Sequence, residues 1–189
     1  LVFEPYSIQM INTELSSQFM THLSTSVYLA LLLASPFILI ELFRFITPAL
    51  YDNERKYSAR ITCTIFLLFI TGVLMSYFVI FPFSIRFLGT YQVSEDVVNM
   101  INLSSYISTF TALTFMMGIV FQIPVISFFL AKMGILEAEF MAKYRRHALI
   151  IIMILAAIIT PPDIFTLVLV TIPMYALYEL SILIVKRIN

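Results

Sequence analysis

The chain of 189 residues has little of what soluble proteins carry on their surfaces. Charged residues make up only 12% of it, whereas a soluble domain carries about a quarter. Tryptophan is absent, there are four glycines, and the single cysteine, Cys63, cannot form an internal disulfide. Because Cys63 lies in an apolar run, we expect a small buried side chain there. The 11 basic and 11 acidic residues cancel, so the net charge does not indicate a nucleic-acid partner.

The chain is instead rich in apolar residues. They make up 61% of the chain, and the mean hydropathy is +0.99. Such a chain cannot hide its apolar surface from water, so a polytopic, all-α membrane protein is predicted. One integral membrane domain would cover 1–189, with five transmembrane helices of which the last two are short. The predicted spans cover about residues 20–43, 59–81, 104–131, 148–159 and 164–185.

Basic residues predict the orientation of these spans. Ten of the 11 lie in 44–60, 132–146 and 186–187, and only Arg86 lies elsewhere. The positive-inside rule places those ten in the cytoplasm, together with the C-terminus. Residues 1–19, 82–103 and the turn 160–163 would then lie outside. Since the chain begins outside with Leu1, we expect one further helix upstream, and a five-span protein with an outer N-terminus is the alternative.

Several polar residues interrupt the apolar runs and have structural interpretations of their own. Asp163 follows the short turn "TPPD" and is placed to cap the last span, where the helix dipole favours an anion. Pro124 should kink the third span near Gln122. Glu41 is expected to pair with Arg44, three residues further on.

Five sequence blocks carry a family resemblance. They are "FITPALYDNERK" (45–56), "YFVIFPFSIRFL" (77–88), "FQIPVISFFLAKMGI" (121–135), "KYRRHALIIIMILAAIITPPDIF" (143–165) and "IPMYALYELSIL" (172–183). In order and spacing they resemble the TatC family of the twin-arginine protein translocase. The resemblance covers nearly the whole chain from about residue 17, and it implies six spans, both ends in the cytoplasm and a short last pair of helices.

The resemblance also implies a function. Family members are receptor subunits that bind twin-arginine signal peptides of folded proteins. They recruit small single-span partners of the TatA and TatB type, form multimeric complexes and use the proton-motive force. The bacterial cytoplasmic (inner) membrane is the simpler location for this chain, and a plastid membrane is the alternative. No enzyme activity, cofactor or metal site is expected, and the sequence contains no P-loop.

The signal-peptide site implied by the resemblance lies in the first charged segment. Its residues would be Phe45, Pro48, Leu50, Glu54 and Arg55. A carboxylate such as Glu54 can bind guanidinium through charge-assisted, bidentate hydrogen bonds. The alternative for Glu54 is an ordinary solvated pair with a neighbouring arginine. Asp52 departs from the residue common in the family and is a secondary candidate.

A second set of residues would form a pocket or contact partner helices: Tyr77, Gln122, Thr160, Asp163 and Glu179. Each has a structural alternative. Tyr77 could be an interface tyrosine, Gln122 could make an interhelical hydrogen bond, and Glu179 could form a salt bridge or extend to the cytoplasmic surface. Leu167 stands where many members have glutamine, so polar docking there is in doubt or shifts to Thr166.

Three other classes compete with a receptor. An intramembrane protease would need a Ser–His pair, paired aspartates or an HExxH motif in the spans, and the sequence has none. A small-molecule transporter or channel predicts internal repeats and glycine-broken helices, which the sequence does not show. A membrane scaffold stays open.

Overall fold

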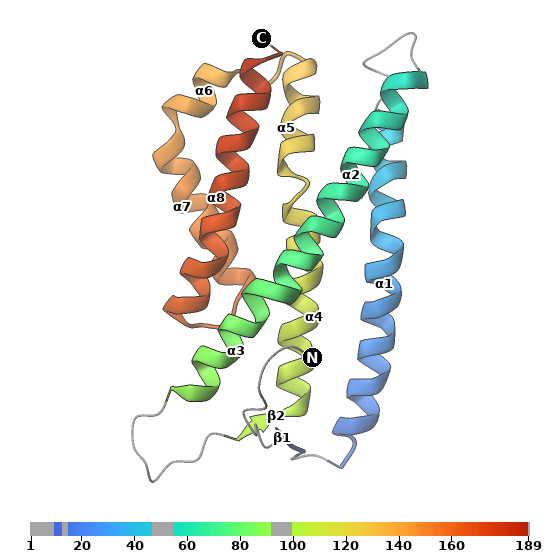
Figure 1. The fold of residues 1–189 in the computed structure, drawn as a ribbon, viewed down its shortest axis with the longest axis vertical. Coiled ribbons are helices and arrows are strands. Elements are labelled where there is room, and N and C mark those ends of the chain that lie inside the picture. The colour runs from blue at the N-terminus through green and yellow to red at the C-terminus, as the bar shows by residue number, and fades with distance from the viewer. Residues whose placement is uncertain (1–9, 13–14, 47–54, 92–99, 189) are drawn as a thin grey trace.

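A computed structural model describes the chain except for residues 1–9, 13–14, 47–54, 92–99 and 189, and except for the side chains of 46 and 55–59. The described part is a helical bundle, which confirms the predicted all-α fold (Figure 1). A short parallel strand pair, β1 (Met10–Ile11) and β2 (Ile101–Asn102), joins two segments at one end of the bundle.

The helices follow the apolar segments of the sequence. They are α1 (Ser17–Ile46), α2 (Arg55–Met75), the π-helix η2 (Ser76–Ile80), α3 (Phe81–Thr90), α4 (Leu103–Val120), α5 (Ile123–Lys132), α6 (Ala138–Lys143), α7 (Arg145–Ile159) and α8 (Ile164–Lys186). Among the described residues, four stretches are long and apolar enough to cross a membrane: Ser17–Phe45, Arg60–Thr90, Leu103–Lys132 and Ile164–Lys186. The chain is therefore a multi-pass membrane protein.

Helix α7 covers the fourth predicted span and is shorter than these four. Its 15 residues extend over about 22 Å at the usual rise of 1.5 Å per residue. A bilayer's hydrocarbon core is about 30 Å thick, so α7 alone does not match it. The fourth predicted span, 148–159, therefore stays a prediction.

One expectation about the second span, that for Cys63, was wrong. The helix of this span also extends past residue 81, through η2 and α3 to Thr90. Pro82 directly follows the π-helical turn η2, and such a turn is one of the local irregularities at which a helix accommodates a proline. Cys63 is exposed and not buried. An apolar run in a membrane helix is hydrophobic on all sides, so hydropathy does not distinguish a lipid-facing position from a core position.

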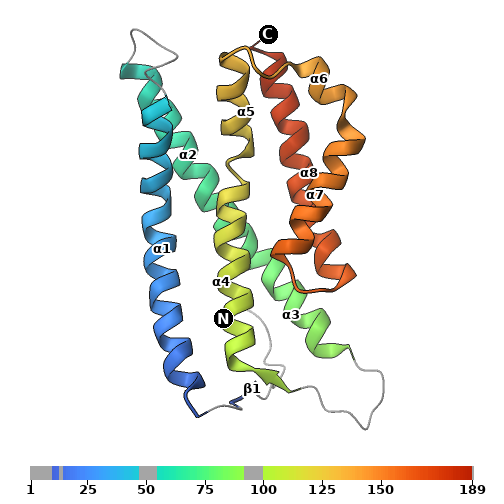
Figure 2. The ribbon, with the colours of Figure 1, turned by 180° about the vertical axis from the view of Figure 1, so that it is seen from behind.

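The tilted helix α2–η2–α3 crosses α4 at the centre of the bundle. It passes in front of α4 in Figure 1 and behind it in Figure 2. Glycines allow the close approach: a Cβ on Gly72 would lie 2.5 Å from the Met117 carbonyl oxygen. On α4, a Cβ on Gly118 would lie 2.6 Å from the ring of Phe69. This crossing fixes how α1 and α2 stand relative to the rest of the bundle.

A second contact region joins α4, α7 and α8. Ala156 on α7 and Val170 and Met174 on α8 are fully buried in one cluster. Aromatic rings extend this cluster toward the end where α4 begins, since Phe81 lies edge-on to Tyr106 and Phe110 at centroid distances of 5.0 and 4.9 Å. Helices α7 and α8 thus form an antiparallel pair that packs against α4.

Candidate functional site

The predicted signal-peptide residues lie where α1 ends and α2 begins. Phe45, in the last turn of α1, is 85% exposed. One turn earlier, Glu41 and Arg44 form the predicted ion pair at 2.7 Å on the exposed helix surface. Pro48, Leu50, Glu54 and the secondary candidate Asp52 lie outside the described residues, and Arg55 is described only as the start of α2.

Gln122 lies at the break between α4 and α5. Pro124 stands in the first turn of α5, as the predicted kink requires. The Gln122 side chain is 1% exposed, and its Nε2 donates to the Ile65 carbonyl on α2 at 3.2 Å. Its Oε1 is buried and has no partner among the described residues. The geometry thus contains the interhelical hydrogen bond, and contact with a peptide stays a prediction.

Replacing Gln122 by leucine should change the free energy of unfolding by less than about 1 kcal/mol. The lost bond to Ile65 destabilises by roughly 0.6–2 kcal/mol, and removal of the unpartnered Oε1 offsets a similar amount. Gln122→Ala, which also leaves a cavity, should cost at least about 2 kcal/mol. Equilibrium unfolding by SDS in mixed micelles measures both. A leucine variant as unstable as the alanine variant would show that the hydrogen bond dominates.

The turn between α7 and α8 holds Thr160 and Asp163. Asp163 Oδ1 accepts a 2.6 Å hydrogen bond from the Thr166 backbone N–H, which confirms the predicted cap. Thr160 is largely buried, and its hydroxyl donates to the Ala156 carbonyl at 2.9 Å. Asp163 Oδ2 and the Thr166 hydroxyl are buried without a partner among the described residues. The turn therefore has hydrogen-bonding capacity left over.

Glu179 on α8 makes three polar contacts. Its Oε1 lies 2.9 Å from Arg145 Nε and accepts a 3.0 Å hydrogen bond from the Tyr175 hydroxyl. Its Oε2 accepts from Arg145 Nη2 at 3.0 Å. The pair is bidentate, with side chains 34% exposed for Glu179 and 48% for Arg145. Of the alternatives for Glu179, the salt bridge is the one present within this chain.

Sequence reasoning missed Arg145 as the partner, although a signal existed. Arg145 precedes Thr160 by 15 residues, and Glu179 follows Asp163 by 16. Positions equally far from the turn of an antiparallel helix pair lie at the same level, so the short turn predicts this contact. Tyr178 links α8 to α6 as well, because its hydroxyl donates to the Met141 carbonyl on α6 at 2.9 Å.

Tyr77 lies on η2, half-exposed, with ring contacts to Phe78 at 4.9 Å and Phe110 at 5.8 Å. The structure does not gather the five pocket candidates at one place. Asp163 and Glu179 stand 16 residues apart on α8, which is about 24 Å along the helix. Among the described residues, no three His, Cys, Asp or Glu side chains are grouped to hold a metal ion.

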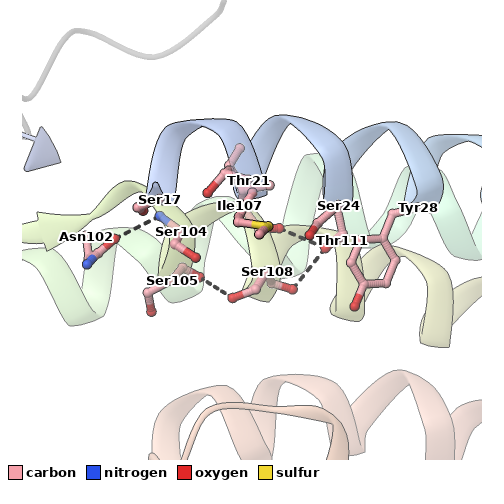
Figure 3. A pocket seen from close by; sticks show the side chains of 11 residues that line it. Ser17, Thr21, Ser24, Tyr28, Asn102, Ser104, Ser105, Ile107, Ser108 and Thr111 are labelled. Atoms are coloured by element: carbon pink, nitrogen blue, oxygen red, sulfur yellow. Dashed lines mark hydrogen bonds between the residues drawn. The ribbon is translucent and has the colours of Figure 1, made fainter. Parts of the chain in front are cut away.

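A polar cavity of about 500 Å³ lies between the first turns of α1 and α4 (Figure 3). Hydroxyl side chains, with Asn102, Ile107 and Met20, line it, and none of the predicted site residues whose side chains are described does. Several polar groups bond within their own segment: Thr111 Oγ1 donates to the Ile107 carbonyl at 2.8 Å, and Asn102 Oδ1 accepts from the Ser104 N–H at 2.9 Å. The described lining residues carry no charged side chain.

Comparison with known proteins identifies the family. The family model for the Sec-independent protein translocase protein (TatC) matches residues 1–173. The chain belongs to the TatC family. Curated relatives agree: the TatC protein of Blattabacterium sp. subsp. Periplaneta americana (strain BPLAN) is 40% identical over 180 residues, covering 95% of this chain and 68% of the relative. The TatCy protein of Bacillus subtilis (strain 168) is 38% identical, covering 84% of this chain and 62% of the relative.

A solved TatC structure has the same fold. The crystal structure of the twin-arginine translocase receptor TatC superposes with a TM-score of 0.85 at 31% identity, covering 96% of this chain and 79% of that one. The family resemblance and the polytopic helical fold are therefore confirmed. As a TatC protein, the chain is a membrane component of a protein translocase and not an enzyme.

Proposed function

We propose that this chain is the receptor core of a twin-arginine translocase and binds the signal peptides of folded proteins. Its likeness to the solved receptor TatC, over 96% of the chain, carries the proposal. It would work in the bacterial cytoplasmic membrane, with the C-terminus and the segment between α1 and α2 in the cytoplasm. The basic residues at the inner ends of α2 and α8, such as Arg60 and Lys186, support this orientation.

The proposed recognition chemistry is a carboxylate that meets a guanidinium at the membrane surface. Glu54 would accept bidentate hydrogen bonds from one of the two signal-peptide arginines. Phe45, whose ring is exposed beside this segment, would contact apolar parts of the peptide. Pro48, Leu50 and Arg55 would shape the loop, since Pro48 fixes one backbone dihedral and removes a donor.

The helices that carry the second set of predicted site residues are proposed to recruit partner proteins. Single-span proteins of the TatA and TatB type would dock near Thr160 and Asp163, where buried oxygen atoms keep hydrogen-bonding capacity. Glu179, Tyr77 and Gln122 would contact partner helices or the inserted peptide. Transport would use the proton-motive force, in multimeric receptor complexes.

Photocrosslinking from Asn53 tests the receptor function in the full-length protein. A labelled twin-arginine peptide should crosslink strongly, and its twin-lysine version should crosslink roughly tenfold less, because lysine lacks the planar bidentate fork. Glu54→Ala should give the same loss with the arginine peptide.

Asp52→Ala is the matched control for this experiment, since it removes a carboxylate from the same segment. It should retain most of the labelling. Equal labelling by both peptides, or equal losses in Glu54→Ala and Asp52→Ala, would mean that the segment attracts basic peptides only through its general charge.

A further inference from the structure

The connection between α5 and α7 carries exposed aromatic and basic side chains at one end of the bundle. Three exposed rings lie in a row: Phe140, Tyr144 and His147. The ring centroids of Phe140 and Tyr144 are 4.6 Å apart, and those of Tyr144 and His147 are 5.4 Å apart. Lys143 Nζ lies 5.8 Å from the centre of the Tyr144 ring. Figures 1 and 2 show α6 at the same end as the C-terminus, which is the end of the cytoplasmic leaflet in the proposed orientation.

Two of the cations in this patch form no ion pair among the described residues. Arg145 is neutralised by Glu179, but neither Lys143 nor Arg146 has a carboxylate within 4.0 Å among the described residues. Glu137 and Glu139 are exposed nearby and form no ion pair with another described residue. Two cations therefore face the membrane surface beside aromatic rings, which favour the interface between headgroups and acyl chains.

The length of α7 makes this position unusual. Helix α7 begins at Arg145 and spans only about 22 Å, so its first turn reaches the headgroup level only if the leaflet thins or its lipids adapt. The helix surface next to the patch is apolar and open to lipid, because Ile150 and Ile151 are each 57% exposed. In a bilayer thinned around α7, headgroups would lie close to Lys143 and Arg146.

We propose that Lys143 and Arg146, with the rings of Phe140 and Tyr144, form a binding site for the phosphate headgroup of anionic phospholipid at the inner end of α7. Each cation attracts an anionic headgroup, and the aromatic rings fix the depth of the site. The bound lipid would hold the short helix α7 at the correct depth in the bilayer. The site requires neither a signal peptide nor a partner protein, so it goes beyond the receptor function.

The absence of tryptophan allows a direct test. Ile150→Trp places a single fluorophore on the lipid-facing surface one turn from Arg146. Ile38→Trp is the matched control reporter, because Ile38 is 58% exposed and lies near the balanced pair Glu41–Arg44. Both proteins are reconstituted in phosphatidylcholine with small fractions of acyl-brominated phosphatidylglycerol or acyl-brominated phosphatidylcholine, and quenching gives the relative affinity for the anionic lipid.

We expect the affinity for phosphatidylglycerol to exceed that for phosphatidylcholine by about fivefold or more at Ile150→Trp. At Ile38→Trp the ratio of the two affinities should be about one. The double change Lys143→Gln and Arg146→Gln should bring the first ratio to about one, whereas Glu139→Gln should raise it. Equal quenching by brominated phosphatidylcholine in all variants verifies insertion. A ratio below two in the parent, no effect of the double change, or loss of the preference on adding inorganic phosphate at constant ionic strength would overturn the proposal.

Discussion

Gly72→Ala should lower the free energy of unfolding by about 1–2 kcal/mol. The new Cβ would lie 2.5 Å from the Met117 carbonyl oxygen and 2.9 Å from Cγ of Phe121. The first neighbour is backbone and cannot rotate away, so α2 and α4 must separate, at a cost of roughly 1–3 kcal/mol. Alanine's better helix propensity offsets up to about 1 kcal/mol of this. SDS unfolding in mixed micelles measures the difference.

Gly89→Ala is the matched control for that variant. Among the described residues, the same methyl group at Gly89 meets Cδ1 of Ile101 at 3.7 Å, which is an ordinary contact. It should leave stability unchanged or raise it by up to about 1 kcal/mol. Equal effects of the two substitutions would mean that the close approach of α2 and α4 is not what requires glycine at position 72.

Exchanging the charges of Arg145 and Glu179 should test the tie between α7 and α8. Arg145→Glu places two carboxylates together, and Glu179→Arg places two guanidinium groups together. Each should cost about 1–2 kcal/mol, less than for a buried pair because both side chains are partly exposed. The double exchange should recover at least half of the summed loss, since the Tyr175 hydroxyl can accept from an arginine as well as donate to a glutamate.

The measurement is a double-mutant cycle in the same SDS unfolding assay. Tyr175→Phe, which keeps the ring and removes one hydrogen bond to Glu179, should cost about 1 kcal/mol. If the double exchange is as unstable as the sum of its two single changes, Arg145 and Glu179 do not stabilise each other. Glu179 would then be available to a partner helix without competition from Arg145.

The ion pair between Arg145 and Glu179 also affects how the candidate residues could work together. Arg145 is held by Glu179, while its neighbour Arg146 is exposed. The inner end of α7 thus ties α7 to α8 within the hairpin and leaves a second cation exposed. A partner helix that docks at the opposite end, near Asp163, would meet a hairpin whose depth and tilt are already fixed.

Hydropathy and turn chemistry in the sequence determined the helical membrane fold, because about 20 apolar residues in a row have few alternatives to a helix in a bilayer. They also gave the turn at residues 160–163, the cap at Asp163, the break at Pro124 and the pair Glu41–Arg44, all of which depend on residues close together in the chain. The family blocks in the sequence led to TatC, and the candidate site residues rest on those blocks.

Tertiary structure alone decided which faces of the helices meet. Membrane helices are apolar on all sides, so no periodic pattern marks Gly72 as the crossing point or Cys63 as exposed. The contact of Gln122 with Ile65 joins residues 57 positions apart, and the pairing of β1 with β2 joins residues 91 apart. Such contacts depend on packing between helices that are distant in the chain, because small side chains and single polar groups select a neighbour only when the backbones have come close enough to meet.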